Sequence, residues 1–485
     1  MPYEPTRASL SAHPLPDWFN DAKFGIFIHW FPSAVAGWAP LSGELTQIIK
    51  AHGFRYWLKN NPYTEWYANS LRIPGSPVQA YHRETYGADF PYDGFMPLFR
   101  AASEKWDGDA WADAFAAAGA RYVVMGTKHH DGFLLWPSWH PNPFKPDYQL
   151  QRDVIGELAA AVHARGMKLG LYYSGGLDWT FNDHVLADVD DLVAAVPQQP
   201  EYAAYAEAHW RELIERYEPA VLWNDIGFPY AANLLKLFAD YYNTIPDGIV
   251  NDRFLQANLG QPGSLRSRLI RGAIRLLMPL LMKRQGGLGS PSGGPPADFR
   301  TPEYAAAKGI EARKWEACRG MGYSFGYNRL ETDEHMIAPD ELVRSFVDMV
   351  SKNGNLLLNV GPMADGTIPE IQMRRLAAMG AWLKVNGEAI YGTRPWTRAE
   401  GQTAAGTPIR FTRRGDALYA ILLDTPPAAP VVIRDLALPA DAQAHLLGRA
   451  EPLRWTQQDA DIVLDAPQPW PASPAHALRF APVHA

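Results

Sequence analysis

Seven short β-rich runs in the sequence each end in side chains that can bind a polar ligand, move a proton or stack on a ring. In a parallel barrel the carboxyl ends of the strands meet over one mouth, and reacting groups gather there. One polar strand end often only caps a turn, but seven of seven such ends predict a ligand-binding or active site. The side chains are His29, Trp30, His129, His130, Asp131, Tyr172, Tyr173, Trp223, Asp225, Asn251, Asp252, Arg253, Tyr327, Asn328 and Asn359.

Two of these strand ends allow more than one interpretation. Asp225 can be a reacting carboxylate, or it can cap the turn and helix that follow it. His129 and His130 could ligate a metal, but adjacent residues of a strand point to opposite faces of the sheet. No HExxH motif and no cysteine pair accompanies them. The residues therefore favour a site without metal.

The elements that must position these side chains alternate along the chain up to residue 395. Helical patterns at 111–118, 154–165, 202–217, 341–351 and 370–385 lie between the β-rich runs, and several begin or end at Gly or Pro. Apolar runs joined by helices of this size are typical of parallel strands. We expect a (β/α)8-like TIM barrel with one strand unaccounted for. The runs are 25–30, 121–127, 168–174, 220–226, 248–253, 323–328 and 355–360.

The remaining residues have a different pattern. Residues 396–485 alternate short apolar runs with Pro, Gly and Asp turns, and no helical period continues. This pattern predicts a small antiparallel β-sandwich. The sequence therefore indicates an α/β protein with two domains, a barrel over residues 1–395 and a C-terminal sandwich over residues 396–485.

An insertion at about residues 254–297 belongs to neither pattern. Within it, residues 264–284 carry six basic and no acidic residues between apolar ones. The longest uncharged stretch, LLMPLLM, is far shorter than the roughly 18 residues that span a bilayer. The segment could lie on a membrane surface or contact a partner subunit, which leaves a homo-oligomer open. We favour a helix over the barrel mouth, with its apolar stripe against protein.

Composition excludes several classes of protein. The chain has 485 residues, with 45 Lys+Arg and 52 Asp+Glu, so its formal net charge is −7. This mildly acidic balance argues against a nucleic-acid binder. The single cysteine, Cys318, excludes an internal disulfide and a thiolate metal cluster. The first sixteen residues contain no apolar run typical of a signal peptide, so we expect a cytoplasmic protein without a transmembrane segment.

Nine motifs, spread over residues 23–369, are more specific than any single strand end. They are KFGIFIHW (23–30), KHHDGF (128–133), GLYYSGGLDW (170–179), LWND (222–225), NDR (251–253), DFRTPEY (298–304), KWE (314–316), SFGYN (324–328) and NGNLLLNVGPMADGTIP (353–369). Together and in this order they resemble the α-L-fucosidases of glycoside hydrolase family 29. The resemblance implies a barrel followed by a β-sandwich, and exo-acting, retaining hydrolysis of terminal α-linked L-fucose from glycans, without metal or organic cofactor.

The resemblance also implies which two carboxyl groups react. Retaining hydrolysis needs a nucleophile and an acid/base about 5 Å apart. Asp225 in LWND matches the family's nucleophile, and Glu303 in DFRTPEY matches its acid/base, whose pKa must be raised by burial or by the charge of Asp225. Glu65 and Glu316 are rivals for the acid/base role. Without the resemblance, Glu303 is equally an acid in the first turn of a helix after Thr301-Pro302.

Further positions match residues that line the fucose pocket in the family. Neutral imidazoles and a carboxylate can share hydrogen bonds with vicinal hydroxyls, while aromatic rings can cover the 6-deoxy methyl group and the C–H face of the sugar. Arg253 could instead orient Asp225 or form a buried salt bridge. The implied binding residues are His29, Glu65, Trp66, His129, His130, Tyr172, Trp223, Arg253 and Phe325.

The sequence departs from the family motif at one point, and two alternative functions remain open. The family motif usually continues from His-Trp into Gly, whereas Phe31-Pro32 follows here, which bears on the loop beside the pocket and on the leaving group accepted. One alternative is a non-catalytic carbohydrate-binding protein on the same fold. The other is an inverting or metal-dependent hydrolase. In each case the expected partner is a fucosylated oligosaccharide or glycoconjugate.

Overall fold

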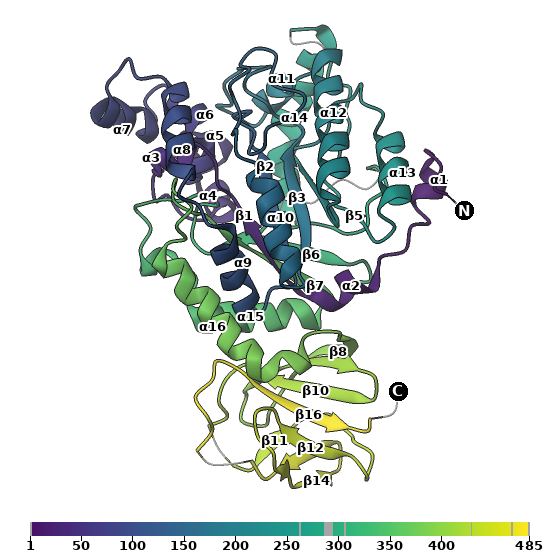
Figure 1. The fold of residues 1–485 in the computed structure, drawn as a ribbon. Coiled ribbons are helices and arrows are strands. Elements are labelled where there is room, and N and C mark those ends of the chain that lie inside the picture. The colour runs from purple at the N-terminus through teal and green to yellow at the C-terminus, as the bar shows by residue number, and fades with distance from the viewer. Residues whose placement is uncertain are drawn as a thin grey trace.

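The computed structural model describes residues 2–260, 263–285, 294–304, 307–427, 429–466 and 469–483. A parallel sheet of seven strands curls into a TIM-like half-barrel, and antiparallel sheets follow it toward the C-terminus (Figure 1). The strand order in the large sheet is β5-β4-β3-β2-β1-β7-β6. The strands are β1 (Phe24–Ile28), β2 (Tyr122–Lys128), β3 (Lys168–Ser174), β4 (Val221–Asp225), β5 (Ile249–Val250), β6 (Trp315–Gly320) and β7 (Gly354–Val360).

Helices join these strands and cover the outside of the half-barrel (Figure 1). The longer ones are α9 (Gly108–Ala117), α10 (Val154–Ala164), α12 (Pro200–Tyr217), α13 (Leu234–Thr244), α14 (Leu265–Gln285), α15 (Pro339–Ser351) and α16 (Glu370–Asn386). Shorter helices are α1 (Arg7–Leu10), α2 (Asp17–Ala22), α3 (Ser33–Ala36), α4 (Leu45–His52), α5 (Phe54–Lys59), α6 (Tyr67–Leu71), α7 (Pro77–Tyr86), α8 (Phe95–Ser103), α11 (Asp191–Ala195), η1 (Thr64–Trp66), η2 (Tyr92–Gly94), η3 (Asp333–His335) and η4 (Gly387–Ala389).

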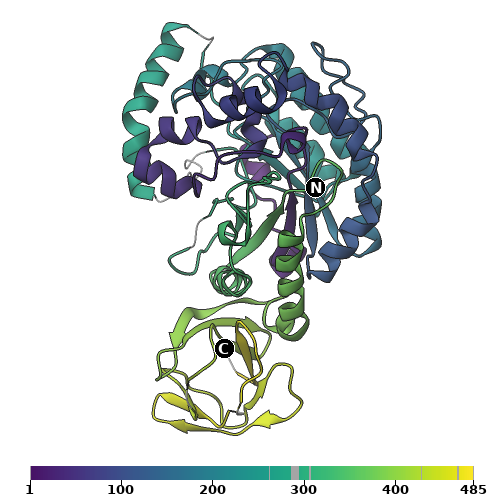
Figure 2. The same cartoon turned by 90° about the vertical axis from the view of Figure 1, so that its left-hand side faces the viewer.

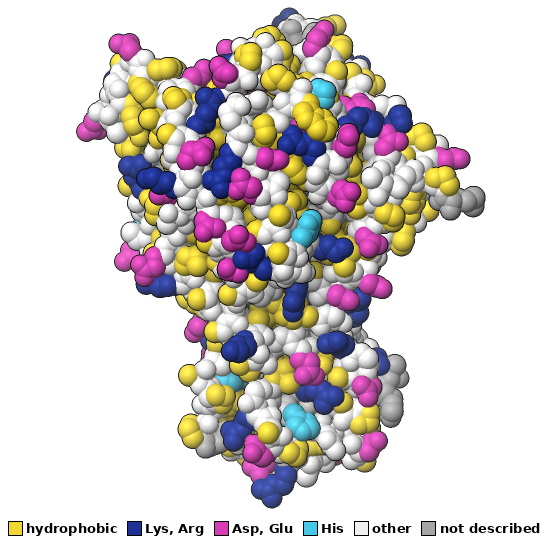
Figure 3. All heavy atoms as spheres, viewed as in Figure 1, with side chains coloured by type: hydrophobic (Ala, Val, Ile, Leu, Met, Phe, Trp, Pro, Cys, Tyr) yellow, Lys and Arg dark blue, Asp and Glu magenta, His cyan; other side chains and the backbone are white. Residues whose placement is uncertain are grey.

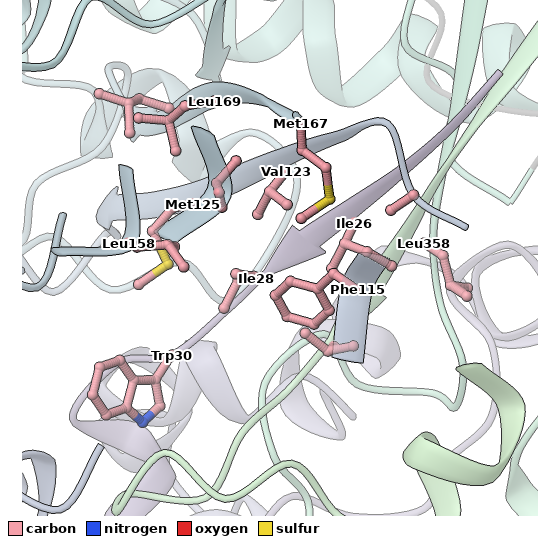
Figure 4. Packing of buried hydrophobic residues seen from close by; sticks show 14 of the residues in the cluster. Ile26, Ile28, Trp30, Phe115, Val123, Met125, Leu158, Met167, Leu169 and Leu358 are labelled. Atoms are coloured by element: carbon pink, nitrogen blue, oxygen red, sulfur yellow. The ribbon is translucent and has the colours of Figure 1, made fainter. Parts of the chain in front are cut away.

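Successive side chains of the barrel strands enter two separate apolar clusters. Ile26 and Ile28 of β1 point outward, where they pack with Val123 of β2 and Phe115 of α9 (Figure 4). Because both faces of the parallel sheet are covered, every residue of β1 is buried and the strand is a continuous apolar run. The residue between the two isoleucines, Phe27, belongs to the inner cluster with Tyr122, Val124, Tyr172, Trp223 and Leu357.

An eighth, irregular segment connects the two edges of the half-barrel. Phe299 forms a parallel β-bridge with Asn251, just beyond β5, and Glu303 forms one with Cys318 of β6. The N–H of Cys318 donates to the carbonyl of Pro302 at 3.2 Å. Residues 299–303, called the closing segment below, therefore supply the position that the β-rich runs left unaccounted for.

One predicted strand is wrong. Residues 323–328 form an irregular loop, and the strand beside β7 is β6, which contains most of the KWE motif. Tyr323–Phe325 have the aromatic character of a strand, but the N–H groups of the loop are bound by side chains instead of a neighbouring strand. The other six predicted strands correspond to β1, β2, β3, β4, β5 and β7.

The five predicted helices are confirmed as α9, α10, α12, α15 and α16, each within one turn at both ends. Side-chain caps explain the starts of α9 and α10, because the side chain of Asp107 accepts the N–H of Ala110 and that of Asp153 accepts the N–H of Gly156. After α10 the chain turns through Gly166, whose φ of 71° lies in the left-handed region that favours glycine.

The C-terminal part is the predicted antiparallel β-sandwich. A six-stranded and a three-stranded sheet share one apolar cluster, to which Phe411 and Leu418 of the first and Ile433 and Ile462 of the second contribute. The predicted division at residue 395 falls inside β8, and it remains a prediction. The strands are β8 (Arg394–Gln402), β9 (Pro408–Arg414), β10 (Ala417–Leu422), β11 (Val431–Ile433), β12 (Gln443–Leu446), β13 (Pro452–Leu453), β14 (Trp455–Gln458), β15 (Asp461–Leu464) and β16 (His476–Ala481).

The sandwich and the barrel share apolar contacts through α15 and α16 (Figure 1). Tyr419 and Ile421 of β10 belong to the same apolar cluster as the barrel core, whereas Leu418 and Leu422 of this strand face the inside of the sandwich. The indole N–H of Trp382 on α16 donates to the carbonyl of Ala475 at 2.9 Å. Both faces of β10 are therefore covered.

The basic insertion contains a helix, as predicted, but the leucines whose side chains the structure describes are exposed instead of packed against protein. In α14, which stands at the outer edge of the barrel part (Figure 2), Leu265, Leu269 and Leu276 are 72%, 66% and 71% exposed. The opposite side of the helix is held instead, because Arg271 pairs with Asp190 at 2.9 Å and with Asp191 of α11 at 2.7 Å. Ion pairs therefore attach this part of the helix to α11 and the residue before it.

The surface agrees with a chain of mixed charge. On the face in Figure 3, Lys and Arg side chains are interspersed with Asp and Glu. Among the described residues, no helix combines the length and the apolar character needed to cross a bilayer.

Candidate active site

Side chains from four strand ends meet around Tyr172 of β3. Its hydroxyl donates to Oδ2 of Asp225, the last residue of β4, at 3.1 Å. The centre of its ring lies 5.3 Å from that of His29, which follows β1, and 5.9 Å from that of His129, which follows β2. The ring of Trp223 lies 5.6 Å away on the other side. The carboxyl end of the sheet thus gathers these residues as the sequence predicts.

Arg253, which follows β5, joins the two candidate reacting carboxylates. Its Nη1 donates to Oδ1 of Asp225 at 2.9 Å and to Oε1 of Glu303 at 2.6 Å. These two oxygens are no more than about 5.5 Å apart, because both contact the same nitrogen. A separation of about 5–5.5 Å between carboxyl groups is typical of retaining glycosidases. Both carboxylates therefore face one site.

Three contacts hold the guanidinium of Arg253 in place. Its Nε and Nη2 donate to the hydroxyl and the carbonyl of Thr301, each at 2.9 Å, and its Cζ lies 4.7 Å from the ring centre of Trp223. The hydroxyl of Thr301 donates in turn to Asp252 at 2.8 Å. Fixed in this way, Arg253 positions both carboxylates, one of the roles that the sequence left open for it.

Glu303 does not begin a helix, so the interpretation of this residue as an acid in a helical first turn is wrong. It belongs to the closing segment, which pairs with β6 because the chain returns from the insertion alongside that strand. The side chain is 26% exposed, against 14% for Asp225. The ion pair with Arg253, at 2.6 Å, directs this carboxyl group toward Asp225.

Glu316, one rival acid/base, lies beneath the site and not in it. It is fully buried, and its two oxygens accept hydrogen bonds from the hydroxyl of Tyr122 and from the indole N–H of Trp223. Burial raises its pKa to about 7. Both oxygens of Glu316 are thus engaged, and one of them supports the ring of Trp223.

Glu65, the other rival, is also buried, and it binds the loop that contains Ser324 and Gly326. Its Oε2 accepts the N–H of Gly326 at 2.9 Å and the hydroxyl of Ser324 at 3.4 Å, and burial raises its pKa to about 7. The neighbouring Phe325 places its ring 5.1 Å from that of His29. These contacts place Glu65 and Phe325 in the cluster, on the side of His29.

The hydrogen bonds of His29 fix its tautomer. Its Nδ1 lies 2.6 Å from Oδ1 of Asn359, whose Nδ2 donates to the carbonyl of Phe325 at 2.6 Å. The amide oxygen of Asn359 can only accept, so Nδ1 of His29 carries the proton. Burial lowers the pKa of His29 to about 4, so the ring is neutral near pH 7 and keeps Nε2 as an acceptor.

The same reasoning applies to His130. Its Nδ1 lies 2.6 Å from the hydroxyl of Ser174, and that hydroxyl donates its only hydrogen to the carbonyl of Leu177 at 2.8 Å. Nδ1 must therefore be the donor, and Nε2 is an acceptor. Burial lowers the pKa of His130 to about 3. Trp66 lies edge-on to this ring, with 5.1 Å between the ring centres.

The argument that His129 and His130 point to opposite faces is wrong. Their ring centres lie only 3.9 Å apart, because β2 ends at Lys128 and the strand alternation does not extend to them. Among the described residues, no group of three or more His, Cys, Asp or Glu side chains has a metal-binding arrangement.

Phe31, the departure from the family motif, lies behind the histidines. The centre of its ring lies 5.2 Å from that of His129, and it is 2% exposed. The ring fills the space that a side chain at Gly126 would need, since a Cβ there would come within 2.5 Å of it. Phe31 therefore supports the histidines from below, and its effect on the leaving group stays a prediction.

Two residues of the site, Ser174 and Thr301, were not among the predicted residues, and a third, Asn359, was predicted only as a strand end. Ser174 and Asn359 orient the two histidines, and Thr301 orients Arg253. Asn359 was in the set of strand-end residues, and Ser174 ends β3, so position at a strand end was the available signal. Thr301 lies in DFRTPEY, two residues before Glu303.

Comparisons with known proteins identify the family. A sequence model described as α-L-fucosidase matches residues 1–268 and 281–388. This chain belongs to the α-L-fucosidase family. Tissue α-L-fucosidase of Homo sapiens is 31% identical over 478 residues, which cover 96% of this chain and 88% of that protein. Plasma α-L-fucosidase of Rattus norvegicus is 33% identical over 486 residues, 96% of this chain and 91% of that protein.

Solved structures of α-fucosidases share the fold over nearly the whole chain. The α-fucosidase of Thermotoga maritima in complex with fucose is 41% identical, with a TM-score of 0.83, and the match covers 99% of this chain and 100% of that one. An α-L-fucosynthase of Thermotoga maritima, in complex with α-L-Fuc-(1-2)-β-L-Fuc-N3, is also 41% identical, with a TM-score of 0.84 and 99% coverage of both chains. The barrel and the sandwich are thus the fucosidase architecture.

Proposed function

We propose that this chain is an exo-acting, retaining α-L-fucosidase that hydrolyses terminal α-linked L-fucose from glycans. The observation that carries the proposal is the pair of carboxylates, Asp225 and Glu303, held by one nitrogen of Arg253 in a member of this family. Their spacing suits a double displacement, in which one group attacks the sugar while the other serves the leaving oxygen.

In the first step, Asp225 attacks the anomeric carbon. A new bond forms between its carboxylate oxygen and that carbon, and the bond from the carbon to the glycosidic oxygen breaks. Glu303 gives its proton to the departing oxygen. Contacts from Tyr172 and Arg253 hold the carboxylate of Asp225 in place for the attack.

In the second step, water hydrolyses the fucosyl ester. Esterified Asp225 has lost its charge, so Arg253 then forms an ion pair with Glu303 alone. Glu303 takes a proton from the water, the oxygen of which bonds to the anomeric carbon as the ester bond breaks. Two inversions release α-L-fucose, with the configuration retained.

The remaining cluster holds the sugar. The Nε2 atoms of His29 and His130 are lone-pair acceptors, suited to hydroxyl groups that donate. Glu65 adds a carboxylate, and Phe325 supplies an apolar ring for the 6-deoxy methyl group. The roles of Trp66, His129, Tyr172 and Trp223 as sugar contacts remain part of this proposal.

The decisive experiment pairs substitutions of the two carboxylates. Asp225→Gly should lower kcat on an aryl α-L-fucoside by about 10³-fold or more, while fucose binding stays measurable by calorimetry. Glu303→Ala should cost far more on oligosaccharides than on an aryl fucoside whose leaving group needs no proton. Unchanged activity in Asp225→Gly would remove the nucleophile from the proposal.

Proton NMR of the first-formed sugar tests the stereochemistry. We expect α-L-fucose to appear first and to mutarotate afterwards, and initial β-L-fucose would contradict double displacement. Turnover should be unchanged by EDTA, which tests the metal-dependent alternative. The cytoplasmic location and the oligomeric state remain proposals, testable by fractionation of cells and by sedimentation.

A further inference from the structure

The loop at residues 323–326, called the wall loop, obtains its hydrogen bonds from side chains. The N–H groups of Tyr323 and Ser324 donate to Oε1 of Glu331 at 2.6 and 3.0 Å. The N–H of Gly326 donates to Glu65, and the carbonyl of Phe325 accepts from Asn359. Buried backbone groups need such partners, because water does not reach them. The wall loop thus depends on these side chains for its shape.

Glu331 is buried, with 7% of its surface exposed, although a carboxylate is costly to remove from water. Burial raises its pKa to about 7. Its acceptor oxygen takes two successive N–H groups, which requires the chain to curl around it. Gly322 permits this approach, since a Cβ at that position would lie 2.5 Å from Oε1 of Glu331.

Ser324 links Glu331 to the predicted sugar-binding side. Its N–H binds Glu331, whereas its hydroxyl donates to Glu65 at 3.4 Å and accepts the N–H of Thr64 at 3.0 Å. Phe325 follows at once, with its ring between His29 at 5.1 Å and Tyr63 at 5.4 Å. Any shift of the wall loop away from Glu331 therefore moves both Phe325 and the partner of Glu65.

We propose that Glu331 is a positioning residue for substrate specificity: it holds the wall loop so that Phe325 and Glu65 fit a 6-deoxy sugar and reject one with a hydroxyl at C6. Glu331 itself touches no substrate in this proposal. The inference rests on the proposed fucosidase function, because it assigns Phe325 to the methyl group of the sugar.

The test compares Glu331→Gln and Glu331→Ala with the wild type. The substrates are an aryl α-L-fucoside and the matching aryl α-L-galactoside, which differ only by a hydroxyl at C6. Gln keeps an acceptor oxygen without the charge, and Ala removes the acceptor. We expect the fucoside-to-galactoside ratio of kcat/KM to fall in the order wild type, Gln, Ala, by about tenfold in the Ala variant. The fucoside loss should appear mainly in KM.

Glu212 provides a matched control. It is a buried glutamate on α12, and it accepts the N–H of Trp139 at 3.0 Å and the hydroxyl of Ser138 at 2.6 Å, outside the site. Glu212→Gln should lower the melting temperature without changing the ratio or KM. Phe325→Leu should reproduce the change of ratio, because it alters the same wall directly.

The outcomes separate the two hypotheses. If the wild type hydrolyses neither substrate, the proposed function fails. If the wild type is active but folded Glu331→Ala has the same fucoside-to-galactoside ratio of kcat/KM as the wild type, the positioning role is wrong. If the Ala variant does not fold, an unchanged ratio in Glu331→Gln leads to the same conclusion. An equal change of ratio in Glu212→Gln would also overturn it, because that result would reflect general loss of stability.

Discussion

At the scale of single residues, Glu316 shows how a buried acid can serve a site without reacting in it. Tyr122 and Trp223 donate to its two oxygens, and Trp223 in turn supports the guanidinium of Arg253. Two residues, Trp223 and Arg253, therefore lie between this carboxylate and the pair Asp225 and Glu303. Its raised pKa reflects burial and is not by itself a sign of catalysis.

Glu316→Gln tests this assignment through pH. Because the pKa of Glu316 in the folded chain is raised from 4.5 to about 7, its favourable contribution is complete below pH 4.5 and is lost as the pH rises through 7. The neutral Gln variant does not lose it. We expect its stability relative to the wild type to improve from pH 5 to pH 8, by about 3 kcal/mol at most. Thermal unfolding at several pH values measures this difference.

The kinetics of the same variant provide the control. Glu316→Gln should keep kcat on an aryl fucoside within about fivefold of the wild type, whereas a catalytic acid would lose about 10²-fold or more on poor leaving groups. A stability difference that does not vary with pH would contradict the charge argument. A loss on poor leaving groups as large as that of Glu303→Ala would instead make Glu316 the acid/base.

At the scale of elements, the closing segment brings Glu303 to the nucleophile. This segment follows the long insertion at about residues 254–297. Its β-bridges to Asn251 and to β6 nevertheless place it between the two edges of the sheet. Thr301 in this segment binds the guanidinium of Arg253 with both its hydroxyl and its carbonyl. The segment therefore positions one carboxylate directly and the arginine indirectly.

Thr301→Val should separate this positioning from folding. The substitution keeps the branched shape but removes the hydroxyl that accepts from Arg253 and donates to Asp252. We expect kcat/KM on an aryl fucoside to fall by about 10-fold or more, because the guanidinium loses one of its fixed partners. Steady-state kinetics and a melting curve of the same sample measure the two effects.

Thr412→Val is the matched control in the sandwich. Thr412 is also buried, and its hydroxyl donates to the carbonyl of Ala389 at 2.7 Å, far from the site. That variant should lose stability without losing activity. Equal activity losses in both variants would show that Thr301 has no specific role.

At the scale of the whole molecule, α14 is attached to the body by ion pairs and exposes Leu265, Leu269 and Leu276. Its ion pairs reach Asp190 and α11, not Asp225, Arg253 or Glu303. The insertion nevertheless begins directly after Arg253 and ends at the closing segment. It is thus placed to affect what surrounds the leaving group more than the reaction itself.

Replacing residues 264–294 by a short Gly-Ser linker tests this division. We expect kcat on an aryl fucoside to stay within about threefold of the wild type, because both reacting carboxylates, Asp225 and Glu303, lie outside the replaced residues. The relative turnover of different fucosylated oligosaccharides, or the mass measured by sedimentation, should change. A variant unchanged in both would show a passive insertion, and loss of aryl turnover would show that the insertion holds the site.

The sequence by itself determined the elements and the strand-end residues. Five helices and six of the seven predicted strands follow from apolar period, caps and glycine positions, because these signals act between residues close in the chain. The family motifs led to Asp225 and Glu303, and to the residues around them. The same local signals predicted a strand at residues 323–328, which was wrong. This aromatic run forms a loop whose N–H groups donate to Glu331 and Glu65.

Only the tertiary structure decided how these residues meet. The contact of Arg253 with both carboxylates, the shared face of His129 and His130, and the burial of Glu316 all join or separate positions that are far apart in the chain or beyond a strand end. Which residues meet depends on how the closing segment joins the two edges of the sheet. It also depends on which donors and acceptors are within hydrogen-bond distance of each buried polar atom. Neither condition is encoded within one segment, because each is set by the packing of the whole barrel.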